Sequence, residues 1–172
     1  MRLPWLGCLL IASSAVAPAQ AAADDDPGFC STIQDVVQAS RTDFIRWRGK
    51  VRDAAPASYD ATRALPRASD CRIEHASPET RYTCEWEYGE NDEAAVRAAA
   101  TKFLDAMLDC LGDKVQEVRA HAESKTDRRQ TTALVVQGGA DSGADLRVTS
   151  GLGPKNSTWY VEFSANRKAV NR

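Results

Sequence analysis

The sequence predicts an α+β fold in which an antiparallel sheet, made of a hairpin and a C-terminal meander, carries two helices packed on one face. Three observations predict it: two segments with apolar residues at helical spacing, period-two alternation within residues 71–88, and short β-branched runs after residue 112. A length of 172 residues fits one compact domain with its own core. We also expect two disulfides to hold this domain together.

The N-terminus has the order of a secretory signal peptide. Residues 1–23 contain Arg2, an apolar run from Leu6 to Ala17 and then a series of small residues. The run is about twelve residues, well short of the roughly 20 that cross a bilayer. We therefore predict a cleaved signal peptide at 1–23 and a single exported domain at 24–172. Its predicted location is the periplasm or the medium, without a membrane span in the mature chain.

Loss of the leader changes the cysteine count and the charge. Of the five cysteines, Cys8 belongs to the leader, which leaves an even number in an exported chain and predicts disulfides. Removal of Arg2 leaves 21 basic against 24 acidic residues, so the formal charge goes from -2 to about -3. A net acidic chain is a poor candidate for nucleic-acid binding, which needs a basic surface.

A first helix is predicted over residues 28–52. Pro27 follows Asp26 as at a helix start, and apolar residues recur at helical spacing from Ile33 to Val51. The other face carries a basic stripe, which suits the negative end of the helix dipole and is interpreted as a solvated face. This stripe consists of Arg41, Arg46, Arg48, Lys50 and Arg52. Residues 53–70 predict a loop, with one short helical turn near 59–64.

A β-hairpin is predicted next, because Tyr82, Cys84, Trp86 and Tyr88 alternate along the chain after a short Ser-Pro loop. Opposite residues in an antiparallel pair have a constant index sum. Pairing Cys71 with Cys84 also places Ile73 opposite Tyr82 and His75 opposite Thr80, all on one face. We therefore predict a disulfide between Cys71 and Cys84.

A second helix is predicted from Asn91 to Gly112, since apolar residues from Val96 to Leu111 fall on one helical stripe. The remaining disulfide would then join Cys30, in the first turn of the first helix, to Cys110, in the last turn of the second. It would close a loop of about 80 residues, worth roughly 4 kcal/mol in the chain-entropy model. Pairing of Cys30 with Cys71 or Cys84 is the alternative.

A four-stranded antiparallel meander is predicted after Gly112. Its strands are expected at 114–121, 131–137, 145–149 and 158–164.

No catalytic set is predicted from the residue types. The chain has two histidines, His75 and His121, and no Gly-x-Ser-x-Gly turn. Oxidised cysteines leave no thiolate for catalysis or for zinc. We therefore expect a protein that is not an enzyme and that has neither a cofactor nor a metal.

An acidic segment supplies the candidate partner-binding residues, which are Glu85, Glu87, Tyr88, Glu90 and Asp92. Exposed carboxylates beside a tyrosine suit a cationic protein partner and speed its capture. The simpler interpretation is that Asp92 favours the start of the second helix and that Glu85 and Glu87 form an ordinary solvent face.

The leading hypothesis is an exported binding protein that inhibits or neutralises a partner protein, as an immunity protein or a hydrolase inhibitor does. The first alternative is a periplasmic assembly or secretion-associated factor that binds its partner at the edge of the meander. The second is a small hydrolase that uses Glu85 or Glu87 against Trp86. The sequence makes no prediction of oligomeric state.

Overall fold

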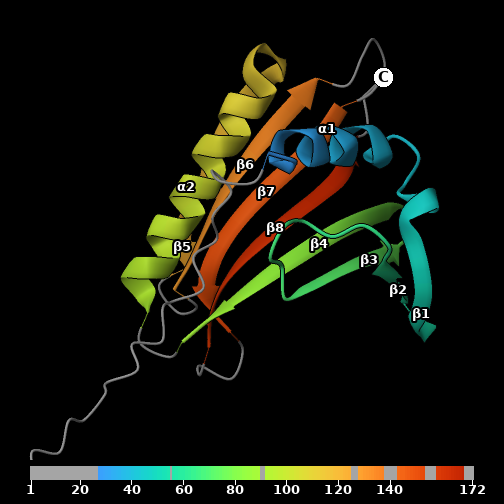
Figure 1. Cartoon of the computed structure of the whole chain (residues 1–172), viewed down its shortest axis with the longest axis horizontal. Helices are drawn as coiled ribbons and strands as arrows, with labels where there is room; N and C mark the ends of the chain where they lie inside the picture. Colours follow the sequence, from blue (N-terminus) through green and yellow to red (C-terminus); the bar gives the residue numbers. More distant parts are fainter. Residues whose placement is uncertain are drawn as a thin grey trace, which may run out of the picture.

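The structure, a computed structural model, describes residues 27–54, 56–89, 92–124, 128–137, 143–153 and 158–168. The predicted signal peptide lies outside these residues, as do Glu90 and Asn91. Within them, the chain forms one eight-stranded antiparallel sheet with two α-helices on the same side of it (Figure 1). The predicted α+β fold class is confirmed.

The helical elements are α1 (Phe29–Ser40), η1 (Ile45–Trp47), α2 (Glu93–Leu111) and η2 (Gly112–Lys114). The strands are β1 (Arg48–Ala54), β2 (Ala57–Ala61), β3 (Asp70–Ala76), β4 (Glu79–Tyr88), β5 (Val115–Ser124), β6 (Arg129–Gln137), β7 (Gly143–Leu152) and β8 (Trp159–Lys168).

This order of elements occurs twice in the described chain. An α-helix, a short 3-10 helix and four strands make the first unit, α1 to β4, and the same series makes the second unit, α2 to β8. The sheet order is β1-β2-β3-β4-β8-β7-β6-β5, so each unit contributes one meander and the two meanders join through β4 and β8. The fold is therefore built from two copies of one α–β4 topology.

Related residues lie at equivalent places in the two units. Asp-Cys-Arg at 70–72 on β3 matches Asp-Leu-Arg at 145–147 on β7. The arginines of these two segments lie in one cross-strand row, because Arg72 pairs with Thr83, Thr83 with Ser164, and Ser164 with Arg147. Each arginine is one strand outside the central pair, on opposite sides.

The first helix is shorter than predicted, and the prediction of a helix to residue 52 is wrong. After Ser40 the chain turns through Asp43 and Phe44, whose φ angles of 51° and 54° are left-handed. The N–H of Phe44 bonds back to the carbonyl of Ala39 at 3.0 Å, a bond that ends a helix. Phe44 and Trp47 do enter the core, as the helical spacing requires, but from a turn and from η1.

Residues predicted as the end of that helix and as a loop form the β1–β2 hairpin instead. The basic stripe is consequently divided: Arg48, Lys50 and Arg52 lie on β1 rather than on a helix. As an edge strand, β1 is mostly exposed, and two register shifts interrupt its pairing with β2. Charge and irregularity of this kind are common on edge strands, where they oppose pairing with other chains. They also remove the apolar alternation that would have identified β1.

The predicted hairpin is confirmed in its register. β3 and β4 pair Cys71 with Cys84, Ile73 with Tyr82, and His75 with Thr80. The predicted disulfide is present, with 4.2 Å between the Cα atoms of Cys71 and Cys84.

The second helix and the meander are also confirmed, with the strands somewhat longer than predicted. α2 begins after Asp92 and ends at Gly112, which has a left-handed φ of 49°. β5 to β8 form the meander, and β8 continues the sheet by pairing with β4.

A chain of buried aromatic rings joins the two units under the helices. Phe103 of α2 contacts Phe29 of α1, Trp86 of β4 and Phe163 of β8, with ring centroids 5.1 to 5.7 Å apart. The predicted Cys30–Cys110 disulfide ties the start of α1 to the end of α2, with 5.1 Å between Cα atoms. The two copies of the topology therefore share one core.

Candidate functional site

The two faces of the sheet differ in cover and in chemistry. One face packs against α1 and α2, and its residues make the apolar core. No described helix packs on the opposite face, which we call the open face. Side chains alternate between the faces along a strand, so Trp86 points to α2 while its neighbours Glu85 and Glu87 point to the open face.

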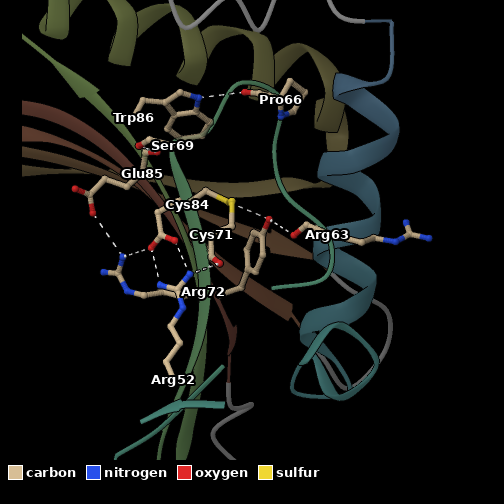
Figure 2. The surroundings of a disulfide bond; sticks show 11 residues. Arg52, Arg63, Pro66, Ser69, Cys71, Arg72, Cys84, Glu85 and Trp86 are labelled. Atoms are coloured by element: carbon tan, nitrogen blue, oxygen red, sulfur yellow. Dashed lines mark hydrogen bonds and ion pairs between the residues drawn. A yellow bond between two sulfur atoms is a disulfide. The ribbon is translucent and has the colours of Figure 1, made fainter. Parts of the chain in front are cut away.

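A group of charged residues gathers on the open face of the first unit and extends to β8. We call it the acidic cluster, and it consists of Asp60, Asp70, Glu74, Glu85 and Glu162 around Arg52 and Arg72. Figure 2 shows Arg52, Arg72 and Glu85 together on one side of the disulfide-bonded strands, whereas Trp86 is directed away toward Pro66. Arg81, the cross-strand partner of Glu74, adds a third guanidinium beside these five carboxylates, so the formal excess is two negative charges.

Arg72 lies at the centre of the acidic cluster. Its guanidinium nitrogens are 2.9 Å from Glu74, 3.4 Å from Asp70 and 3.5 Å from Glu85, and 4.0 Å from Glu162 on β8. The side chain is only 24% exposed. Because its partners come from β3, β4 and β8, Arg72 joins carboxylates across the junction of the two units.

Arg52 completes the acidic cluster from the edge strand β1. Its Nε donates to Asp60 at 2.5 Å, and its terminal nitrogens donate to both carboxylate oxygens of Asp70 at 2.5 and 2.8 Å. Paired, parallel hydrogen bonds of this kind fix the geometry of both side chains. These bonds hold Arg52, Asp60 and Asp70 in one defined arrangement.

The pKa values of two carboxylates in the acidic cluster are shifted in opposite directions. Hydrogen bonds from Arg52 hold the pKa of Asp70 below its usual range, against the opposing effect of burial. Burial raises the pKa of Glu162, helped by the charge of Glu85 and opposed by Arg72. As pH falls, Glu162 is consequently protonated before Asp70.

The structure divides the five residues predicted from the acidic segment. Glu85 belongs to the acidic cluster, and Glu87 is exposed beside it on the same face of β4. Tyr88 is 8% exposed and lies in the core, because it alternates with Glu87, so it does not belong to this surface. Asp92 is the residue before α2, in the connection that follows β4. Glu90 is outside the described residues.

Sequence reasoning missed most of the cluster. Arg72 and Glu74 could have been found, since they alternate with the inward residues Cys71 and Ile73. Glu162 alternates in the same way with the core residues Val161 and Phe163. Arg52 could not have been found, because the sequence pattern predicts a helix over residues 28–52 and therefore no strand there.

Trp86 lies on the opposite face of the sheet from Glu85 and Glu87, the carboxylates of the hydrolase hypothesis. Trp86 donates from its indole nitrogen to the carbonyl of Pro66 and is buried on the helix side, so the hydrolase arrangement of Glu85 or Glu87 against Trp86 is not assembled. His75 lies 2.7 Å from the Thr80 hydroxyl across the hairpin, whereas the side chain of His121 lies outside the described part of the structure. In the described part of the chain, no three His, Cys, Asp or Glu residues are grouped to hold a metal ion.

None of the helices in the described residues is long and apolar enough to cross a membrane. Comparisons of the chain with models of known protein families, with curated proteins and with solved structures find no match.

Proposed function

We propose that this chain is an exported binding protein that docks a cationic protein on the open face of its sheet and thereby inhibits or neutralises it. The observation that carries the proposal is the acidic cluster, an ordered excess of carboxylates on a face that no described helix covers. Such a surface raises the association rate of a positively charged partner and fixes its orientation.

Rigidity supports an inhibitory role. Arg72, Asp70, Glu74 and Glu85 of the cluster lie on strands β3 and β4, which the Cys71–Cys84 disulfide joins (Figure 2). A surface that is already ordered loses less conformational entropy when it binds, which favours a long-lived complex. Export fits the same proposal, since two disulfides form most readily in an oxidising compartment.

A charge-reversal experiment tests the proposal. The chain is measured by surface plasmon resonance against a panel of cationic secreted hydrolases, and the activity of each bound hydrolase is followed. Glu87→Lys is the test variant, because Glu87 is exposed on the open face beside the cluster. Asp105→Lys is the matched control, since it makes the same charge change at an exposed position of α2, on the other side of the sheet.

The expected result is inhibition of at least one hydrolase and a Kd about tenfold or more weaker for Glu87→Lys alone. Equal weakening by both variants would show a general charge effect rather than a docking surface. Failure of every cationic hydrolase to bind would also contradict the proposal.

Strand addition is the second candidate, and β5 is the edge that favours it. β5 is a ten-residue strand paired on one side to β6, and Val118 on it is 53% exposed. A partner added there would bind through main-chain hydrogen bonds. Such a complex would tolerate Glu87→Lys and high salt, but it would be lost when proline replaces Val118.

A further inference from the structure

A groove lies beside the C-terminal half of α1, on the helix side of the sheet and apart from the acidic cluster. Its volume is about 750 Å³, within the range of small-ligand sites. Gln38 lines it from α1, Thr42 from the turn after α1, Ile45 and Trp47 from η1, and Arg63 from the segment after β2. Apolar and cationic side chains therefore meet in one concave site.

The turn after α1 builds the apolar wall of this groove. The two left-handed residues, Asp43 and Phe44, reverse the chain so that consecutive side chains point in different directions. Phe44 is fully buried and stacks on Tyr82 at 5.5 Å between ring centroids. Ile45, the next residue, is 62% exposed at the groove. The backbone conformation thus holds a large apolar side chain in solvent beside Trp47, at a position fixed by the core.

The groove also has one positive charge without a compensating carboxylate. Arg63 is paired with Asp35 at 2.5 Å, and its guanidinium lies over the Trp47 ring at 5.6 Å from the centroid. In Figure 2 the Arg63 guanidinium extends away from the disulfide, on the far side from Arg52 and Arg72. Arg46 also lines the groove, is exposed, and makes no side-chain hydrogen bond or ion pair with another described residue.

We propose that this groove binds a small organic acid with an apolar chain or ring. The apolar part lies against Ile45 and Trp47, and the carboxylate pairs with Arg46. A cationic ligand fits poorly, because Arg63 already neutralises Asp35, the carboxylate that lines the groove. The combination of a mostly apolar wall and a few convergent charged groups is typical of ligand sites.

Octanoate is the probe that tests this proposal, with octanol and octylamine as matched ligands of the same chain length. Binding is followed by NMR, from the Trp47 indole and the Ile45 methyl signals. We expect octanoate to bind with a Kd of about 1 mM or below and to shift both signals, and the other two ligands to bind more weakly.

Three variants locate the contacts. Arg46→Gln is expected to weaken octanoate binding about fivefold or more, and Ile45→Ser is expected to weaken it as well. Both positions are exposed, so the fold should be retained. Lys50→Gln is the control, because it removes a nearby exposed charge on β1 that does not line the groove.

Equal binding of octanol and octanoate, or equal weakening by Lys50→Gln and Arg46→Gln, would overturn the proposal. The proposal would also be overturned if octanoate does not bind and an acidic leucine-containing peptide does. That result would assign the groove to a protein segment instead.

Discussion

The two α–β4 units share a topology but differ in the chemistry of their open faces. The arginines Arg72 and Arg147 occupy one cross-strand row, and each pairs with the aspartate two residues before it, Asp70 or Asp145. Around Arg72 there are three further carboxylates, Glu74 of the same strand, Glu85 of β4 and Glu162 of β8. Arg147 has an ion pair with Asp145 alone among the described residues.

The covered faces differ in a similar way. Cys71 and Cys84 are cross-strand partners in the first unit, and the corresponding partners on β7 and β8 are Leu146 and Ala165. The same pairing of strands is therefore held by a disulfide in one unit and by apolar contact in the other. The comparison indicates that apolar patterning is sufficient for the topology, and that the first unit adds covalent and ionic order at the surface proposed to bind a partner.

The largest expected effect comes from breaking the core that joins the units. Phe103→Ala removes the ring that contacts α1, β4 and β8, and should lower the free energy of unfolding by about 3 to 5 kcal/mol. Chemical denaturation should show a single transition, reported equally by tryptophan fluorescence and by circular dichroism. Val118→Ala, at an exposed position of β5, is the control and should change stability little. Two separate transitions would mean that the units fold independently.

The next prediction compares the stability lost when either disulfide is removed, the one between the units or the one within the first unit. Replacing Cys30 and Cys110 by alanine opens a crosslink with a sequence separation of 80, and replacing Cys71 and Cys84 opens one with a separation of 13. The chain-entropy model gives about 4 kcal/mol for the first and about 3 kcal/mol for the second.

Denaturant midpoints of the two double variants test this order. A larger loss for the Cys71 and Cys84 variant would show that local order in the buried hairpin outweighs loop entropy. Mild reduction adds a kinetic readout: Cys30 is exposed whereas Cys84 is fully buried, so the bond between units should be reduced first, as measured by mass spectrometry of trapped thiols.

The sequence predicts an element correctly where two local patterns, such as cysteine spacing and apolar alternation, indicate the same structure. The β3–β4 register followed from the cysteine spacing and the apolar alternation together, and the structure has that register. β1 was missed because it is an edge strand whose Val51 is 55% exposed, so no alternation marks it. Phe44 and Trp47 kept the helical spacing of core residues although the backbone had already left the helix. Only pairing between distant strands brings Glu162 to Arg72, which no local pattern specifies.

A smaller effect is expected from exchanging the equivalent arginines for an apolar residue. Arg72→Met leaves several partly buried carboxylates without their cation and should destabilise the fold by about 2 kcal/mol. Arg147→Met is the matched control. It should cost less than about 1 kcal/mol, because that side chain is 42% exposed and its ion pair among the described residues is with Asp145 alone. Equal losses in urea denaturation would contradict the difference drawn between the two open faces.

The smallest expected effect is on the pH dependence of stability. The contributions of two carboxylates of the cluster should change with pH in opposite directions. Burial raises the pKa of Glu162 in the folded state, so the folded protein binds this proton more tightly than the unfolded chain and stability falls as pH rises through that pKa. Glu162→Gln removes this penalty. The variant should therefore gain stability relative to the parent as pH increases from about 4 to 7, by less than about 1 kcal/mol.

Asp70→Asn provides the opposite case. Arg52 lowers the pKa of Asp70 in the folded state, so the stabilisation from this carboxylate is present above its unfolded pKa and is lost as pH falls through the folded one. Asp70→Asn should cost more at pH 7 than at pH 3, whereas Glu162→Gln should show the reverse trend. Urea denaturation of both variants across this range decides the matter. Parallel trends would mean that the acidic cluster responds to pH as one averaged charge rather than through two carboxylates in distinct surroundings.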